Sequence, residues 1–257
     1  MIANVITPSA ALKPYIRKYL VIESAEGNAN RVLPDTSLVM AFRFKGDVNY
    51  TSDGVGSKLP SAVISGLRNS ARIINYAQNS GTILVIFKEA IATALFKAPA
   101  HELFNNSLAL DNLFASQDIL QIEEQLAGAT GNAQRIFLVE NFLLSHLINI
   151  APDKLVLAAV QKIDSGKGHT KIKDLANSLY ISQDAFEKRF RKATGASPKQ
   201  YSSIVRMRAL VGKGITNQSL SEMAYTAGYF DQPHFNKDFK LFTGLTPTDF
   251  FKSPLFW

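Results

Sequence analysis

The chain has 257 residues, 46% of them hydrophobic, a net charge of +7 and no cysteine. This length accommodates two domains, each with its own core. The lack of cysteine excludes disulfides, thiolate metal sites and a cysteine nucleophile. The N-terminus lacks the basic and then apolar segments of a signal peptide, and no apolar run reaches the ~20 residues that cross a bilayer, so we expect a cytoplasmic protein.

Residues 1 to about 88 are predicted to form a small β-rich domain. Short segments rich in β-branched and aromatic residues alternate with Gly, Asn, Asp, Ser and Pro, which is typical of strands and turns. The predicted strands are residues 17–23, 37–44, 71–76 and 82–88.

Helical patterns follow up to residue 150. The predicted helices are residues 89–96, 100–104, 116–128 and 134–150. The last of these has more apolar residues than the single stripe that a surface helix needs. It is predicted either to pack against the β-rich domain or to form a two-fold dimer interface that includes Phe137, Leu144 and Leu147.

The first half has no sequence pattern typical of a catalytic or metal-binding site. The chain has 4 histidines, and His101 and His146 lie in separate predicted helices, whereas a metal site needs several imidazoles that converge. His101 and Glu102 occupy adjacent helical positions, which point apart. No phosphate-binding glycine loop or GxSxG elbow occurs. The sequence therefore predicts no enzyme, no metal site and no cofactor, although an effector pocket needs no linear motif.

The second half contains an internal duplication. Residues 182–198 read SQDAFEKRFRKATGASP, and residues 231–247 read DQPHFNKDFKLFTGLTP, at a constant offset of 49 positions. Duplication at this length indicates a repeated unit of architecture.

Each copy encodes a helix with a marked start and a marked end. Ser182 and Asp231 are suited to N-caps, and Gly195 and Gly244 to the left-handed residue that ends a helix. Paired phenylalanines four positions apart share one buried stripe. These phenylalanines are Phe186, Phe190, Phe235 and Phe239.

A short helix is predicted before each copy, at residues 171–179 and 220–227. Another helix is predicted to begin at the proline that is the last residue of each copy. The residues expected to cap these neighbours are Thr170, Ser197, Ser219 and Thr246. A helix, a short turn and a second capped helix describe a helix-turn-helix, whose second helix enters a major groove. We expect two such units, at about 170–195 and 219–244, with recognition helices at about 183–193 and 232–242. Gly228 accommodates one additional residue in the second turn.

Charge is distributed unequally between the two halves. Residues 152–257 contain 16 Lys and Arg against 9 Asp and Glu, whereas residues 1–151 contain 12 of each kind. A basic module attracts the phosphate backbone of nucleic acid whatever its sequence.

These motifs, over about residues 154–252, resemble the DNA-binding domain of the AraC/XylS transcription regulators. The second unit, AYTAGYFDQPHFNKDFKLFTGLTPTDF, is similar to the family signature. The resemblance implies an all-α domain of two helix-turn-helix units joined by a helix, which binds double-stranded DNA. One departure is Phe251, at a position where many members carry an arginine.

The first half is less specifically similar to the sensor-like domains that precede such DNA-binding domains in some bacterial regulators. The similarity rests on Leu33-Pro34-Asp35, on Ser65-Gly66 and on the strand TILVIFK that leads into helices. Thr36 and Lys88-Glu89 depart from the usual glycine and Pro-Gly. The expected fold is thus α+β, with a β-rich domain and trailing helices at residues 1–150 and an all-α domain at residues 154–257.

The DNA-contacting candidates lie on the sides of the recognition helices opposite the phenylalanines. Gln and Asn pair with adenine, and Arg and Lys with guanine. The candidates for base reading are Gln183, Asp184, Glu187, Lys188, Arg191, Gln232, His234, Asn236, Lys237 and Lys240. The candidates for phosphate contact, at helix N-termini, are Ser197, Lys199 and Thr246. Tyr201, Tyr229 and Phe230 are expected in the core.

The function predicted from these patterns is sequence-specific transcription regulation, with residues 1–150 sensing or dimerising and residues 154–257 binding DNA. The expected partner is double-stranded DNA. Further candidate partners are RNA polymerase, an unidentified small-molecule effector and a second copy of the chain, and no membrane is expected. One alternative is a small-molecule-binding or enzymatic N-terminal domain with an accessory tail that docks on nucleic acid. Another is a structural nucleoid protein.

Overall fold

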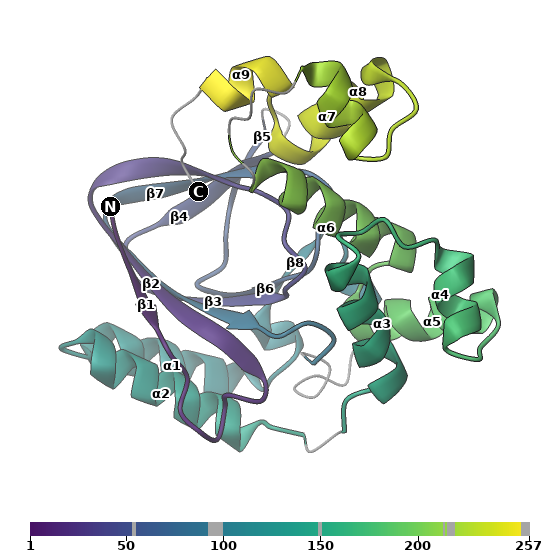
Figure 1. Cartoon of the computed structure of the whole chain (residues 1–257). Coiled ribbons are helices and arrows are strands. Elements are labelled where there is room, and N and C mark those ends of the chain that lie inside the picture. Colours follow the sequence, from purple (N-terminus) through teal and green to yellow (C-terminus); the bar gives the residue numbers. More distant parts are fainter. Residues whose placement is uncertain (53–54, 92–99, 149–150, 213, 215–218, 253–257) are drawn as a thin grey trace.

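The computed structural model describes residues 1–257 apart from 53–54, 92–99, 149–150, 213, 215–218 and 253–257. An antiparallel sheet with trailing helices is followed by a helical C-terminal part (Figure 1). This arrangement confirms the predicted α+β fold class.

Two long strands, β2 (Ile16–Val32) and β7 (Arg72–Phe87), pair with each other over their whole length and form the centre of the sheet. The strand order is β1-β2-β7-β3-β6-β8, and β4 pairs with β7 and with β5. The shorter strands are β1 (Ile2–Ile6), β3 (Val39–Lys45), β4 (Val48–Ser52), β5 (Val55–Lys58), β6 (Ala62–Ser65) and β8 (Ser107–Ala109).

The prediction of separate strands at residues 71–76 and 82–88 is wrong, because both belong to β7. Asn79 has a φ of 55°, in the left-handed region. Pairing with β2 nevertheless continues on both sides of it, through Glu26 with Gln78 and Ser24 with Ser80. Inter-strand pairing thus continues on both sides of a polar segment that, by composition, is typical of a turn.

The helices that follow the sheet are only partly as predicted. Helix α1 (Ser116–Gly128) confirms its prediction, while α2 (Asn132–Ser145) ends before the expected residue 150. The segment predicted as helix 100–104 is the 3₁₀ turn η2 (Ala100–Leu103), and a second 3₁₀ turn, η3 (Leu110–Asn112), precedes α1. Of the predicted helix 89–96, residues 89–91 form a turn and residues 92–96 lie outside the described residues.

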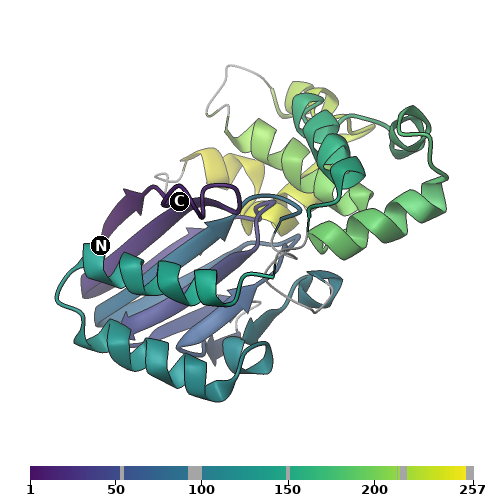
Figure 2. The ribbon, with the colours of Figure 1, turned by 90° about the horizontal axis from the view of Figure 1, so that it is seen from below.

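Helices α1 and α2 cover one face of the sheet (Figure 2). Side chains alternate along each strand, so that Tyr19 and Val21 of β2 belong to the core beneath these helices. Phe42 of β3 meets Phe142 of α2 edge-on, with ring centroids 5.6 Å apart. The intervening residues, Leu20 and Ile22, lie in or against a separate small cluster on the opposite face. Both faces of the sheet are therefore apolar, although these helices cover only one.

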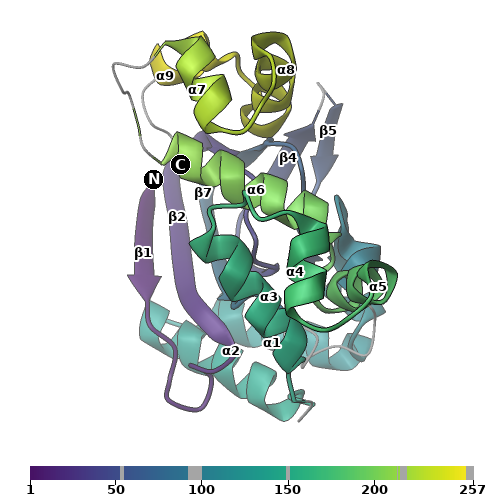
Figure 3. The ribbon, with the colours of Figure 1, turned by 45° about the vertical axis from the view of Figure 1, so that its right-hand side comes forward.

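The C-terminal part is helical, and α6 runs between the two helix-turn-helix units (Figure 3). Its helices are α3 (Lys154–Ser165), α4 (Ile172–Ser178), α5 (Gln183–Thr194), α6 (Pro198–Val211), α7 (Leu220–Thr226), α8 (Gln232–Thr243) and α9 (Pro247–Lys252). The predicted recognition helices correspond to α5 and α8. The four paired phenylalanines of these helices are each 0% exposed, which confirms their predicted burial.

Most helix ends follow the local chemistry of the sequence. Ser182 and Asp231 cap α5 and α8, and Gly195 and Gly244 end these helices with φ values of 88° and 77°. Ser197 and Ser219 each form a reciprocal capping box, and the Thr246 hydroxyl accepts from the Asp249 backbone N–H. The expected cap at Thr170 is wrong: Lys171 is the N-cap of α4, and the Thr170 hydroxyl donates to the Lys162 carbonyl.

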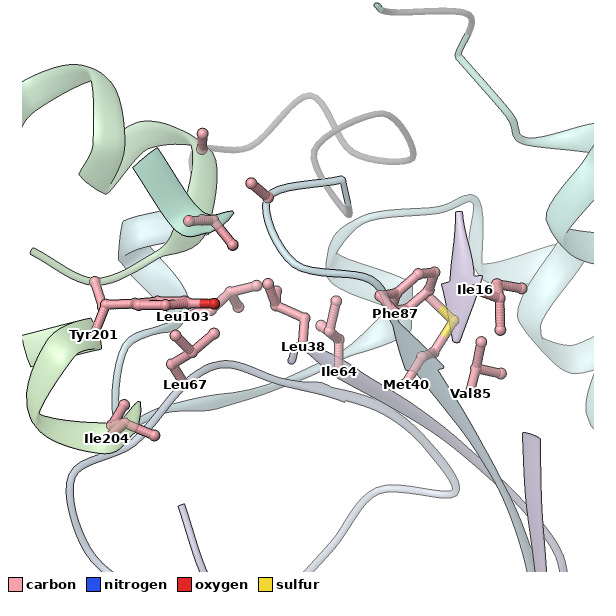
Figure 4. Close-up of a cluster of buried hydrophobic side chains, with 14 of the residues drawn as sticks. Ile16, Leu38, Met40, Ile64, Leu67, Val85, Phe87, Leu103, Tyr201 and Ile204 are labelled. Carbon is pink, nitrogen blue, oxygen red and sulfur yellow. The ribbon is translucent and has the colours of Figure 1, made fainter. Parts of the chain in front are cut away.

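One continuous hydrophobic core joins the sheet to the helical part. Leu67 and Leu103 lie beside Tyr201 and Ile204 of α6 (Figure 4). Gly195 allows a second close approach, because a Cβ there would lie 2.8 Å from the Ala100 carbonyl oxygen of η2. The two parts are thus packed together rather than linked only by the chain.

Candidate nucleic-acid interface and internal cavity

The outer side of α5 is polar and accessible. Gln183, Asp184, Lys188 and Arg191 are exposed, and Glu187 is partly buried. Gln183 donates to the Glu187 carboxylate at 2.9 Å. The structure therefore brings these five base-reading candidates to one helix, on the side away from its buried phenylalanines.

The outer side of α8 is more constrained by its neighbours. Lys237 and Lys240 are exposed, while Gln232 is partly buried and accepts from the Ser221 hydroxyl at 3.1 Å. His234 is exposed, packs edge-on against Tyr229 and lies 3.6 Å from the Asp238 carboxylate.

Asn236 differs from the other candidates of α8 because it is partly buried, and its Oδ1 is buried without a hydrogen-bond partner. An unpaired buried amide oxygen is costly. The side chain is thus placed at the edge of the helix face, with an acceptor that no group of the described residues uses.

The three phosphate candidates are not equivalent. Lys199 is exposed near the start of α6. Ser197 is 8% exposed, and its hydroxyl accepts from the Gln200 backbone N–H in the capping box, so that its side chain is committed to the helix. Thr246 is partly buried and donates to the Asp249 carboxylate at 2.6 Å.

Aromatic residues near the second unit divide into two groups. Tyr201 and Tyr229 are 0% and 7% exposed, which confirms their predicted place in the core. The same prediction is wrong for Phe230, which is 103% exposed, because it stands in the turn before α8 where no element covers it. Phe251, at the position where many members of the resembled family have arginine, packs against Phe239 and Phe250 at 5.7 and 5.3 Å. That position therefore contributes to packing in this chain.

A cavity of about 510 Å³ lies on the face of the sheet opposite α1 and α2. Its walls are mainly aliphatic and include Leu20, Ile22, Val39, Leu84 and Ile86. Arg208, Val211 and Gly212, at the end of α6, complete the lining. A space of this size and composition is typical of small-molecule sites, and it borders the helix that joins the two helix-turn-helix units.

An ion-pair cluster ties the rim of this cavity to α6. Asp35 pairs with Arg208, and its other oxygen lies 3.8 Å from Arg17. Burial alone would raise the pKa of Asp35, but these two guanidinium groups outweigh it and hold the pKa below its ordinary value. The pairing therefore stabilises the fold above the ordinary aspartate pKa, and this contribution is lost as the pH falls through the lowered folded-state pKa.

Arginines are the main polar groups of the lining, and no motif in the sequence marks them as a site. They are Arg31, Arg43, Arg68 and Arg208. Arg43 pairs with Asp47 at 3.3 Å, and Arg31 donates to the Thr243 carbonyl of α8 at 3.1 Å. The one signal in the sequence was that predicted strands such as TILVIFK are apolar at successive positions, which indicates a sheet buried on both faces.

Two kinds of site are not found in the described part of the chain. It contains no cluster of three or more His, Cys, Asp or Glu side chains that could hold a metal ion. None of its helices combines the length and apolar character that crossing a bilayer requires.

Comparisons with known proteins match both halves of the chain. Residues 175–253 match a family described as a helix-turn-helix domain, and residues 4–109 match a domain of unknown function (DUF6597). The Msm operon regulatory protein of Streptococcus mutans is 31% identical over 145 residues, which cover 54% of this chain and 51% of that protein. YisR of Bacillus subtilis, described as an uncharacterized HTH-type transcriptional regulator, is 34% identical over 89 residues. The match covers 34% of this chain and 30% of the length of YisR. The chain thus spans about half or less of the length of these relatives.

Solved structures are similar at lower sequence identity. ToxT from Vibrio cholerae has a TM-score of 0.48 and 11% identity, with 98% of this chain and 97% of that chain covered. The C-terminal domain of AraT, a response regulator from Geobacillus stearothermophilus, has a TM-score of 0.38 and 21% identity over 40% of this chain and 88% of its own. From the duplicated motif, the two helix-turn-helix units and the family match, the C-terminal part of this chain is an AraC-type helix-turn-helix DNA-binding domain.

Proposed function

We propose that this chain is a one-component transcription regulator that recognises a specific duplex DNA sequence. In this proposal residues 154–257 bind DNA, and residues 1–150 sense an effector or dimerise. The observation that carries it is the pair of capped helices α5 and α8, each with a buried phenylalanine pair on one side and polar residues on the other. The excess of positive charge in residues 152–257 supports the same assignment.

Both units belong to one chain and are joined by α6, so we expect the DNA site to be an asymmetric, direct-repeat-like element. The two recognition helices would enter successive major-groove segments on one face of the duplex, roughly 34 Å apart. A structural nucleoid protein would lack this preference. Binding to a selected site that persists at a salt concentration where random DNA is released distinguishes a regulator from such a protein.

We expect alanine at Asn236 and alanine at Lys199 to change DNA binding in different ways. If Asn236 reads a base edge, Asn236→Ala costs about 1–3 kcal/mol and relaxes the preference at one base pair. Lys199→Ala, at a candidate phosphate contact, lowers the affinity for all duplex sequences by the same factor. Fluorescence anisotropy with a duplex selected from a random library, and with its single-base variants, measures both effects.

Lys45→Ala is the control for these variants, because Lys45 is exposed at the end of β3, far along the chain from the helix-turn-helix units. It should leave DNA affinity unchanged. A uniform loss across all duplexes for Asn236→Ala, Gln232→Ala and His234→Ala would contradict base reading by α8.

The cavity supports a role for an effector. Its lining includes three residues at the end of α6, so that a molecule bound there would contact the helix between the two DNA-binding units. An effector shifts a conformational equilibrium only when it interacts more strongly with one state than with the other, and contact with α6 would make its binding sensitive to the position of this helix. We therefore propose that the effector site is this cavity.

A second copy of the chain is a further proposed partner. Phe137 and Leu144 of α2 are 62% and 42% exposed, while the buried side of α2 packs on the sheet. We expect the full-length protein to sediment as a dimer at micromolar concentration and Phe137→Asp to shift it to monomer, with Lys45→Asp as the control. A 28 kDa species for the unaltered chain would leave these residues as ordinary surface.

A further inference from the structure

Arg68 is a charged group of the cavity lining without a counter-charge. It follows β6 and is partly buried. Among the described residues, no carboxylate lies within ion-pair distance of its guanidinium, and no hydrogen bond from its side chain is present. The guanidinium of Arg72 acts on it as a like charge. Arg72 itself contacts the Ser107 hydroxyl, the Asn105 carbonyl and the Tyr50 ring.

The position of Arg68 is electrostatically unfavourable for its guanidinium. Burial, with a smaller effect of Arg72, lowers the pKa of Arg68 to about 10, which still leaves the group charged at neutral pH. A buried charge is costly unless it is paired and hydrogen-bonded. Arg43 and Arg208 pair with Asp47 and Asp35, and Arg31 donates to the neutral Thr243 carbonyl, so that among the described residues Arg68 is the lining arginine without any acceptor.

A second polar group of the lining is also unused. Thr82 is 4% exposed, and its hydroxyl has no hydrogen-bond partner among the described residues. Its strand neighbour across β3 is Arg43, which lies on the same face. Further along these two strands the face is aliphatic, with Leu84 and Ile86 of β7 opposite Ala41 and Val39 of β3.

We propose that the cavity binds an amphipathic carboxylic acid, whose carboxylate pairs with Arg68 and whose apolar body lies along the aliphatic walls. This proposal rests on the effector role given above and names its ligand class. A guanidinium matches a carboxylate with two parallel hydrogen bonds. A phosphate ion has no apolar body to lie along these aliphatic walls. A neutral polyol would leave the Arg68 charge unpaired and would find few partners for its hydroxyls.

The test measures binding of matched probes to the full-length protein by calorimetry, without DNA. The probes are octanoate and dodecanoate, each against the alcohol of the same length, below their micellar concentrations. We expect at least one acid to bind about tenfold or more tightly than its alcohol, as a charge-assisted pair requires. In Arg68→Gln this preference is lost while the alcohol still binds, and in the control Lys45→Gln the preference is kept.

A melting measurement guards against misfolding of the variant. Without ligand, Arg68→Gln should melt at the same temperature as the unaltered chain or higher, because an unpaired buried charge is removed. A second variant, Ala41→Phe, fills the cavity with Arg68 intact and should abolish binding of acid and alcohol alike. Equal binding of acid and alcohol, an unchanged preference in Arg68→Gln, or no binding of any probe would overturn the proposal.

Failure of the regulator proposal gives a different result. If the chain showed no sequence preference in DNA binding, the calorimetric preference for the acid and its loss in Arg68→Gln would still stand. Conversely, if the chain bound DNA specifically but bound none of the acids, the regulator proposal would stand and the proposal of a carboxylic acid ligand would be wrong.

Discussion

Replacing Phe190 or Phe239 by alanine is expected to destabilise the chain by about 3–5 kcal/mol, as is typical for loss of a buried aromatic ring. Each ring is 0% exposed. Phe190 meets Phe186 and Tyr201 edge-on at 5.6 and 5.4 Å, and the Phe239 ring lies 5.6 Å from Phe235 and 5.4 Å from Phe250. A domain has only about 5–15 kcal/mol of stability. We therefore expect these variants to lose DNA binding because the helix-turn-helix unit unfolds, and not because a DNA contact is removed. Urea denaturation followed by circular dichroism measures the change.

Phe230→Ala is the matched control, since the same ring is removed from a position that is 103% exposed. Its effect should stay within about 0.5 kcal/mol. A Phe190→Ala or Phe239→Ala protein that keeps its melting temperature but no longer binds DNA would show that these rings face the duplex.

Leu67→Ala, in the N-terminal part, is expected to cost about 2–5 kcal/mol and to weaken the helical part as well. Leu67 is 1% exposed and lies in the cluster that includes Tyr201 and Ile204 of α6 (Figure 4). Since this core crosses between the two parts, a cavity on one side removes packing from the other. Hydrogen exchange of the α6 amides should therefore accelerate along with exchange of the β7 amides.

Leu120→Ala, at a position 60% exposed on α1, serves as the control and should leave α6 exchange unchanged. Two separate thermal transitions, of which Leu67→Ala shifts only one, would mean that the parts unfold independently despite their shared core.

The helix-turn-helix units were predicted closely because their signals are local. Recognition helices expected at about 183–193 and 232–242 are Gln183–Thr194 and Gln232–Thr243. A cap, a phenylalanine pair four residues apart and a terminal glycine fix such a helix within its own residues. Thr170 failed as a cap because its hydroxyl reaches back to a carbonyl of α3, a contact that depends on tertiary structure.

The sheet was predicted less completely, for the same physical reason. Strand β8 has 3 residues and is held by pairing with β6, 42 or more positions away in sequence. The cavity was not foreseen at all, because Arg68, Thr82 and Arg208 come from a loop, a strand and a helix far apart along the chain. The base-reading and phosphate candidates remain predictions, with Ser197 weakened by its burial and its capping role.

The two helix ends at Gly195 and Gly244 are held in different ways. A Cβ on Gly195 would meet the backbone of η2, whereas one on Gly244 would meet the end of the Arg31 side chain, at 2.3 Å. The backbone of η2 cannot move without shifting its neighbours, whereas the long Arg31 side chain can change rotamer. The first helix-turn-helix unit is thus packed backbone to backbone against the N-terminal part. The second unit is connected to α6 and meets the sheet through the Arg31 side chain. We expect the second unit to shift more readily than the first when the spacing between the two halves of a DNA site changes.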